Sequence, residues 1–418
     1  MSKKILIGLI VTLILIAIAL GVYFFFFSPK GEGGDGDFSF GKFFPFGNPQ
    51  GVTGDSTENR GGNEEGVSTT TEEVVPAPRI RKISNDQIAG STLIDTRDAT
   101  IVRYVERGTG HVYEATSNTL SQKKISNTTI PKIYEALWTG KGDSVLLRYL
   151  KSDNETIETF YAKLGKSNSA TEDSEVVGEL EGTFLQTDIK EIVVSPSKVS
   201  IFSLISDISG SIGTVSLPDG TKISKIFSLP VKEFLVSWPK DSTLVLTTKP
   251  SANVLGYTYT LDSKSGAFVK VLGDIRGLTV LANPALSHIL YSEGRQGKIF
   301  LNIFDVKNGS FASTPFQTLP EKCVWSKAET LVFYCAVPKE IVSGEYPDIW
   351  YQGSLSFSDK IWKIDLNTNT TTLIADTKEE AAIDVDAIHL SLNEKENYLT
   401  FTNKKDSSLW GIQLDITP

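Results

Sequence analysis

A module made of two adjacent strands recurs along this chain with almost constant internal spacing. Each copy opens with a turn-like start signal and closes with an acidic residue at a strand end. The separations are 24, 24, 22 and 24 residues in the pairs Ser195 to Asp219, Trp238 to Asp262, Asn283 to Asp305 and Ser391 to Asp415. The module restarts at positions 138, 195, 238, 283, 325 and 391. A unit that returns every roughly 40–50 residues is typical of the blades of a β-propeller.

Alternating β-branched and aromatic residues, interrupted by turn residues, predict seven hairpins after residue 79. The clearest is IVRYVERGTGHVYEA, where two alternating runs flank Gly108-Thr109-Gly110. The other six are SVLLRYL with IETFYAKL, VSIFSLI with IGTVSL, TLVLTTK with YTYTL, HILYSE with IFLNIFDV, LVFYCAV with DKIWKIDL, and NYLTFT with SLWGIQLD. Helical periodicity is nearly absent from this region. The pattern predicts an all-β fold, a seven-bladed β-propeller.

Closure of the predicted ring requires a strand from the beginning of the domain. Seven four-stranded blades need twenty-eight strands, but the final hairpin ends only a few residues before the C-terminus. The segment from Arg79 to Ile83 precedes the first hairpin and has no blade of its own. Because a closed ring protects its sheet edges, we expect this segment to form the outermost strand of the last blade.

A run of 23 residues without a charge, from Ile5 to Phe27, predicts a transmembrane signal anchor, since a helix needs roughly 20 apolar residues to cross a bilayer. The alternative, a buried core helix, would require a helical domain around it. Lys3 and Lys4 precede the run, so the positive-inside rule places residues 1–4 in the cytoplasm. The expected location is the bacterial cytoplasmic (inner) membrane, with a single pass and the propeller outside.

Residues 28–78 predict a flexible stalk between membrane and propeller. They contain eleven glycines, few aliphatic residues and an acidic excess, so they cannot bury enough apolar surface to fold. Five phenylalanines within FSFGKFFPFG interrupt this pattern and fit either an extension of the interfacial aromatic belt or a short partner-binding motif. The expected organisation is a cytoplasmic stub (1–4), the anchor (5–27), the stalk (28–78) and the propeller (79–418).

The chain has two cysteines, Cys323 and Cys335, and we expect them to form a disulfide. An oxidising exterior favours pairing, and a hairpin turning near Glu329 would place the two residues opposite each other. Two buried thiols are the alternative. A zinc site is not expected, because no second pair of ligands accompanies the cysteines.

Blade six departs from the repeat, because its closing acid is delayed to Asp365, forty residues after Trp325. The extra residues are PKEIVSGEYPDIWYQGSLSFS, which begin three residues after Cys335. Loops of this length are usually functional or disordered, and the aromatic content argues against disorder. The candidate binding residues are Tyr346, Asp348, Trp350, Tyr351 and Asp359. Two readings stay open: the aromatic residues contact a ligand or partner, or they pack the loop onto the ring.

A second insertion, GKSNSATEDSEVVGELEG, follows Leu164, and its polar composition predicts a solvated loop.

The familiar catalytic and cofactor motifs are missing from this sequence. The three histidines are far apart, and there is no nucleophile elbow, His-Glu-x-x-His pair, Walker loop or calcium loop. We therefore predict no catalytic residues, no metal site and no cofactor. Paired carboxylates from Glu345, Asp348 and Asp359 could still meet at the propeller funnel, as glycoside cleavage would need. Residues 79–418 carry about five of the nine net negative charges, so nucleic acid is not an expected partner.

The Ser-Pro and Trp-Pro starts, with a closing hydrophobic-Asp pair, resemble the periplasmic Tol-Pal propeller and its WD40-like relatives over about residues 79–418. The segments CVWSKAETLVFYCAVP and YPDIWYQGSLSFSDKIW also resemble membrane-anchored propeller proteins of small-genome bacteria whose role is undefined. The resemblance implies a propeller outside the cytoplasm. We expect a non-enzymatic protein-binding or scaffold module of the cell envelope, bound to another envelope protein or a glycan. The alternative is an envelope glycan hydrolase or lyase.

Overall fold

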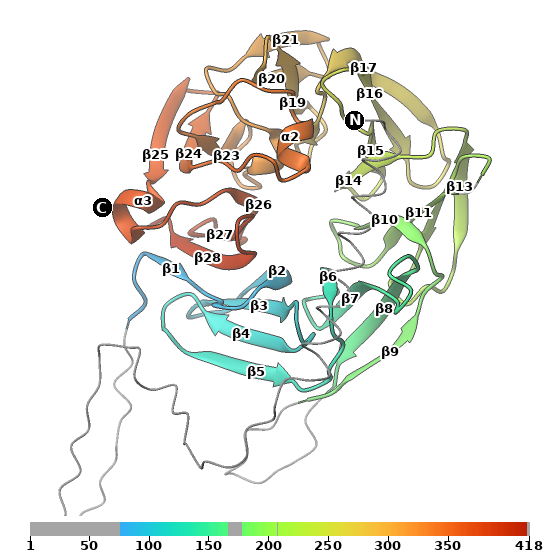
Figure 1. Cartoon of the computed structure of the whole chain (residues 1–418), viewed down its shortest axis with the longest axis vertical. Helices are drawn as coiled ribbons and strands as arrows, with labels where there is room; N and C mark the ends of the chain where they lie inside the picture. Colours follow the sequence, from blue (N-terminus) through green and yellow to red (C-terminus); the bar gives the residue numbers. More distant parts are fainter. Residues whose placement is uncertain (1–75, 166–177, 207, 416–418) are drawn as a thin grey trace, which may run out of the picture. The chain divides into compact units, whose positions relative to one another are not determined.

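A computed structural model of the chain describes residues 76–165, 178–206 and 208–415. Seven antiparallel four-stranded sheets are arranged around a common centre (Figure 1). These sheets belong to one compact unit that spans residues 72–418. The predicted all-β, seven-bladed propeller is therefore confirmed.

The first four blades follow the chain from the inner strand outwards. Blade 1 contains β2 (Ile88–Asp95), β3 (Thr100–Glu106), β4 (Val112–Thr116) and β5 (Gln122–Ser126). Blade 2 contains β6 (Ile133–Thr139), β7 (Ser144–Leu150), β8 (Ile157–Leu164) and β9 (Leu180–Phe184). Blade 3 contains β10 (Ile189–Val194), β11 (Ile201–Ser206), β12 (Ser211–Ser216) and β13 (Ser224–Leu229). Blade 4 contains β14 (Phe234–Lys240), β15 (Thr243–Thr248), β16 (Leu255–Asp262) and β17 (Phe268–Arg276).

The last three blades carry the few helical turns of the described residues. Blade 5 contains β18 (Val280–Ala282), β19 (His288–Arg295), β20 (Lys298–Asp305) and β21 (Ser310–Ser313). Blade 6 contains β22 (Cys323–Trp325), β23 (Val332–Pro338), β24 (Asp359–Asp365) and β25 (Thr370–Ala375). Blade 7 contains β26 (Ala387–Leu392), β27 (Tyr398–Asn403), β28 (Ser408–Gln413) and β1 (Ile80–Lys82). The helical turns are η2 (Pro320–Lys322), α2 (Asp348–Tyr351) and α3 (Thr377–Ala381).

The strand that closes the ring lies where the strand count predicts it. β1 pairs antiparallel with β28, and Arg81 stands opposite Gly411. The buried Arg81 side chain also donates hydrogen bonds to the carbonyls of Thr116 and Thr119 in blade 1. One strand from the start of the domain thus completes blade 7 and joins it to its neighbour.

The core lies between neighbouring blades. In a propeller both faces of a blade are covered, so an inner strand reads as a continuous apolar run. The second strands show this: the first five residues of β7 (SVLLRYL) are buried, and so are all six residues of β27 (YLTFTN). The outermost strands of blades 1 to 6 are more exposed, as β21 illustrates with four exposed residues.

The ring has two faces with different connections. We call the insertion face the one that carries the connections between blades and those from second to third strands, among them residues 249–254, 296–297 and 339–358. The turn face carries the turns from first to second strands, among them residues 140–143 and 195–200. The first hosts the predicted loop of blade six.

Several predicted segments lie outside the described residues: the anchor, most of the stalk with its phenylalanines, and residues 166–177 of the second insertion. Within the described ranges, no helix combines the length and the apolar character needed to cross a bilayer. Residues 76–78, the end of the predicted stalk, contact blade 1, where Pro76 forms an isolated bridge with Thr119 and the Ala77 N–H donates to the Asn118 carbonyl.

Candidate functional site

The blade-six insertion (residues 339–358) connects β23 to β24 and folds back over the ring. It contains the short helix α2, which lies at the inner side of the ring in Figure 1. Tyr346 and Trp350 are only 2% and 3% exposed. Both rings pack against Phe357, with centroids 6.1 and 6.2 Å away. They share a buried apolar cluster with Ile299 of β20 and Leu319 next to η2, so these two predicted site residues attach the insertion to the propeller.

Asp348 connects the insertion to blade 4, and Tyr351 connects it to the start of its own blade. The Asp348 carboxylate accepts a 2.6 Å hydrogen bond from the Ala252 N–H in the loop of blade 4. The Tyr351 hydroxyl donates to the Glu321 carboxylate at the start of blade 6, while its side chain stays 40% exposed. Of the three aromatic residues that the sequence singled out, Tyr351 is thus the one that solvent or a ligand can reach.

Beneath the insertion lies a fully buried ionic group, the Lys322 cluster, made of Lys322, Asp359 and Asp386. The Lys322 ammonium donates to Asp359 at 2.7 Å, to Asp386 at 2.5 Å and to the Ala387 carbonyl at 3.0 Å. The other oxygen of Asp386 accepts from the Trp350 indole N–H at 2.9 Å and from a backbone N–H of the insertion.

The cluster fixes the insertion from below. Buried charges persist only when they are paired and hydrogen-bonded, so its three members depend on one another. Burial raises the pKa of Asp359 to about 6, against the lowering effect of Lys322. Asp359, predicted to contact a ligand, is 1% exposed and takes part in this support instead. Lys322 and Asp386 were not predicted from the sequence.

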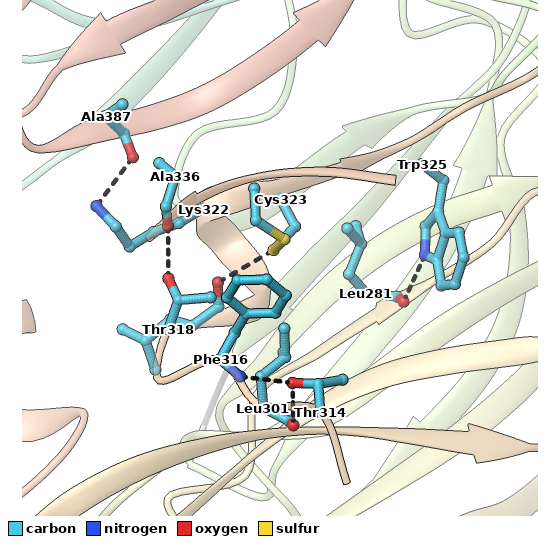
Figure 2. Close-up of a disulfide and its surroundings, with 12 residues drawn as sticks. Leu281, Leu301, Thr314, Phe316, Thr318, Lys322, Cys323, Trp325, Ala336 and Ala387 are labelled. Carbon is cyan, nitrogen blue, oxygen red and sulfur yellow. Dashed lines mark hydrogen bonds between the residues drawn. A yellow bond between two sulfur atoms is a disulfide. The ribbon is translucent and has the colours of Figure 1, made fainter. Parts of the chain in front are cut away.

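The predicted disulfide forms at the root of the insertion. Cys323 and Cys335 stand directly opposite each other on β22 and β23, with an S–S distance of 1.99 Å. Two positions further along the same two strands, Trp325 stands opposite Phe333, as expected from the hairpin. Figure 2 shows Lys322 beside Cys323, with its ammonium directed at the Ala387 carbonyl. The disulfide and the Lys322 cluster therefore hold the same end of blade 6.

A cavity of about 630 Å³ opens on the insertion face between blades 4 and 5 and the insertion. Its lining comes from three chain segments and the insertion itself: Ala252, Asn253, Leu255, Asp274, Ile275, Arg276, Glu293, Gly294, Arg295, Gln296, Gly297, Lys298, Ser343, Gly344, Glu345 and Tyr346. The volume is in the range of about 300–1,000 Å³ that small-molecule sites usually have. We call it the insertion-face cavity.

Glycines allow the insertion to lie close enough to form this wall. A Cβ atom at Gly277 or Gly294 would stand 2.7 or 2.8 Å from the Tyr346 carbonyl oxygen, which is too close for any side chain. Gly297 adopts a left-handed backbone (φ 71°), and its carbonyl accepts a 3.0 Å hydrogen bond from the Gly344 N–H. Blade 5 is therefore shaped to receive the insertion.

A second group that sequence patterns did not reveal lies on the inner strands. Glu135, Glu191 and His389 sit at β-bulges of β6, β10 and β26, where the regular alternation of side chains is broken. Burial, reinforced by the charge of Glu135, raises the pKa of Glu191 to about 7. His389 is exposed yet surrounded by inner strands, and this desolvation lowers its pKa. Raised and lowered pKa values of this kind suit acid–base chemistry.

Within the ranges that the structure describes, no group of three or more His, Cys, Asp or Glu side chains is placed to hold a metal ion.

Comparison with known proteins adds support for the fold. No family model matches the sequence, and no curated protein sequence matches it. Among solved structures, an oligogalacturonate lyase in complex with manganese is similar with a TM-score of 0.52 and 10% identity, covering 80% of this chain and 93% of that one.

Two further structures are less similar. The β-propeller domain of the Trilobed protease from Pyrococcus furiosus has a TM-score of 0.48 and 8% identity, covering 79% of this chain and 96% of that one. The hydrazine synthase of Kuenenia stuttgartiensis has a TM-score of 0.48 and 10% identity, covering 79% and 97%. At these identities the likeness concerns the fold alone. The chain is similar to seven-bladed β-propellers, as the resemblance to Tol-Pal propellers implied, and the comparisons assign no family.

Proposed function

We propose that this protein is a non-enzymatic binding or scaffold module whose ligand or partner occupies the insertion-face cavity. The observation that carries the proposal is the way the insertion is held: by the disulfide, by the Lys322 cluster and by the bond from Ala252 to Asp348. A wall fixed in this way loses little conformational entropy when it binds, which favours affinity. Loops on one face of a rigid ring are also where propellers can vary specificity.

The charges of the cavity suggest a polar partner. Its lining includes the cations Arg276, Arg295 and Lys298 and the anions Asp274, Glu293 and Glu345. Both signs are therefore present, as suits a hydroxyl-rich glycan or a polypeptide segment that carries both charges. Tyr351, which is partly exposed, adds an aromatic side chain to the surface of the insertion.

The proposal includes the location predicted from the sequence. Residues 5–27 would anchor the chain in the bacterial cytoplasmic membrane, and residues 28–78 would hold the propeller outside. A disulfide is consistent with an oxidising compartment. The partner would then be another envelope protein or an envelope glycan.

Photo-crosslinking in cells tests this proposal. A photoreactive residue at Lys298 or Ser343, both exposed at the cavity, should capture the same partner from either position. The matched control is Lys225, an exposed residue of the outermost strand β13. Capture of one partner from both cavity positions and not from Lys225 is the expected result. Equal capture from all three positions, or from Lys225 alone, would contradict the proposal.

A second candidate function is an envelope glycan hydrolase or lyase that uses carboxylates at the funnel. Glu191 favours it, because a carboxyl with a pKa of about 7 next to Glu135 could act as an acid or a base. Asp359, considered for this role from the sequence, is closed off from solvent. Purified protein should release no products from envelope glycans if it only binds. Release that is lost in Glu191→Gln protein would establish the enzyme instead.

A further inference from the structure

A second cavity of about 630 Å³ opens on the turn face, at the other end of the ring. Five blades contribute to its lining through their inner strands and the turns that follow them, so the cavity lies on the axis of the ring. Its polar lining includes Thr92, Asp95, Lys141, Lys198, Lys327 and Glu394. We call it the axial cavity.

Three lysines line the axial cavity without a carboxylate partner. Among the described residues, no ion pair within 4.0 Å involves Lys141, Lys198 or Lys327. The Lys198 ammonium donates to the Thr92 hydroxyl at 3.1 Å. Burial and the nearby charge of Lys327 both lower the pKa of Lys198, and Glu394 opposes them. Like charges held together in a partly desolvated place attract an anion.

The two acids of the cavity do not neutralise this group. The Asp95 carboxylate is occupied by its own surroundings: it accepts from Thr100 at 2.7 Å, from the Asn393 amide at 2.9 Å and from the Lys395 N–H at 3.1 Å. Within the described ranges Glu394 forms no ion pair with the lysines, and its charge only partly offsets theirs at Lys198. The lysines therefore leave an excess of positive charge at the mouth of the axial cavity.

The backbones that carry the two inner lysines are fixed. Lys198 has a left-handed conformation (φ 59°), its N–H donates to Ser195, and its carbonyl accepts from the Gly140 N–H of blade 2. The Lys327 N–H donates to the Glu396 carboxylate of blade 7 at 2.5 Å. The two turns come from different blades, each is tied to a neighbouring blade, and both lysines line the same cavity.

We propose that the axial cavity binds a small oxyanion, a carboxylate or a phosphate, between Lys198 and Lys327, with Lys141 at the rim. Ammonium groups form charge-assisted hydrogen bonds with either type of anion. The volume suffices for a small molecule with several such groups. This site is separate from the insertion-face cavity and does not depend on the function proposed for it.

Titration of the full-length protein in detergent with inorganic phosphate and with citrate tests the proposal, with calorimetry as the readout. Saturable binding of at least one anion is expected, and it should weaken as salt concentration rises. Lys198→Gln and Lys327→Gln should each reduce the affinity about tenfold, since each removes a charge-assisted hydrogen bond. Tighter binding of phosphate would identify a phosphoryl ligand, and tighter binding of citrate a polycarboxylate.

Lys222→Gln is the matched control. Lys222 also has a left-handed backbone (φ 56°), but it is exposed and lies outside the cavity, so its replacement should leave binding unchanged. Because Lys327 is exposed, its variant should fold even if Lys198→Gln does not. Two results would overturn the proposal. One is that neither phosphate nor citrate shows saturable binding at concentrations below about 10 mM, and the other is that the Lys327→Gln and Lys222→Gln variants bind the anion with equal affinity.

Discussion

Replacement of Asp386 by asparagine is expected to destabilise the propeller by about 3–5 kcal/mol, the usual cost of breaking a buried ion pair. Asp386 accepts three hydrogen bonds through its two oxygens: from Lys322 at 2.5 Å, from the Trp350 indole at 2.9 Å and from the Phe357 N–H at 3.0 Å. All of these groups are buried. One carboxylate therefore joins the ring to the insertion.

The magnitude follows from what an asparagine can accept. If its oxygen faces Lys322, its amide NH₂ group faces the donors Trp350 and Phe357, and the reverse orientation leaves the ammonium opposite a donor. Each buried donor left without an acceptor costs about 1–3 kcal/mol. In either orientation of the asparagine amide, Asp359 is the one remaining member of the cluster with a charge opposite to that of Lys322.

Asp359→Asn is the matched control, and it should cost less, about 1–3 kcal/mol, because it leaves only one buried amide group without an acceptor. One oxygen of Asp359 accepts both from Lys322 and from the Ala387 N–H, and a side-chain carbonyl can keep these bonds. The other oxygen has no partner among the described residues, so the amide NH₂ group placed there becomes a buried donor without an acceptor. The substitution leaves Lys322 and Asp386 as a pair of opposite charges.

The two variants also differ in their pH dependence. Burial raises the pKa of Asp359 from 3.8 to about 6, so between these values the folded state holds more protons than the unfolded state. The free energy of unfolding of the wild type therefore falls as pH rises from about 4 to 6. Asp359→Asn should remove this fall.

Urea unfolding at pH 7, followed by circular dichroism, measures both free energies. Limited proteolysis reports on the insertion. A protease should cut Asp386→Asn protein between residues 339 and 358, whereas the insertion of the Asp359→Asn control should resist cleavage. Equal free energies for the two variants would refute the reasoning, because the cluster would then not depend on which acid is lost.

Three further predictions concern other parts of the ring. Replacing both cysteines by serine should lower the free energy of unfolding, measured in urea, by about 2–4 kcal/mol. Reductant should lower the free energy of unfolding of the wild type by the same amount, and a wild type that is insensitive to reductant would contradict this prediction. Deleting residues 79–85 should cost about 3–6 kcal/mol, because two buried isoleucines and the closing strand are lost; a loss below about 1 kcal/mol would argue against closure by β1. Since the pKa of Glu191 is raised from 4.5 to about 7, the free energy of unfolding should fall as pH rises between these values. Glu191→Gln should reduce this pH dependence of the free energy of unfolding, and the same pH dependence in wild type and variant would disprove the prediction.

The sequence predicts those parts of the fold that depend on neighbouring residues. Second and third strands are rich in apolar residues, and in every blade except the sixth a short connection joins them, so all seven hairpins could be located. The closing strand followed from a strand count. The disulfide followed from the register of one hairpin, in which Cys323 and Cys335 stand opposite each other.

The support of the insertion could not be predicted, because it is formed by residues far apart in the sequence. Lys322 and Asp386 are 64 residues apart. The sequence on either side of each residue indicates only an ordinary, solvent-exposed charged side chain. The aromatic residues of the insertion were recognised, but packing and binding both use Trp and Tyr, so composition could not assign Trp350 to the interior.

The inner-strand carboxylates escaped prediction for a related reason. Glu135 and Glu191 lie at bulges, where an extra residue shifts the side chains from one face of the strand to the other. An alternating pattern does not show in advance where such a shift occurs. The lysines of the axial cavity come from separate turns, so only the closed ring brings them together.

The central claim, that a partner binds in the insertion-face cavity, is tested most directly by measuring the affinity of the crosslinked partner for two charge-reversal variants. Lys298→Glu changes the lining of the cavity, whereas Lys225→Glu makes the same change on the outermost strand of blade 3. We expect Lys298→Glu to weaken binding at least about tenfold and Lys225→Glu to leave it unchanged. Equal affinities for the two variants would contradict the account.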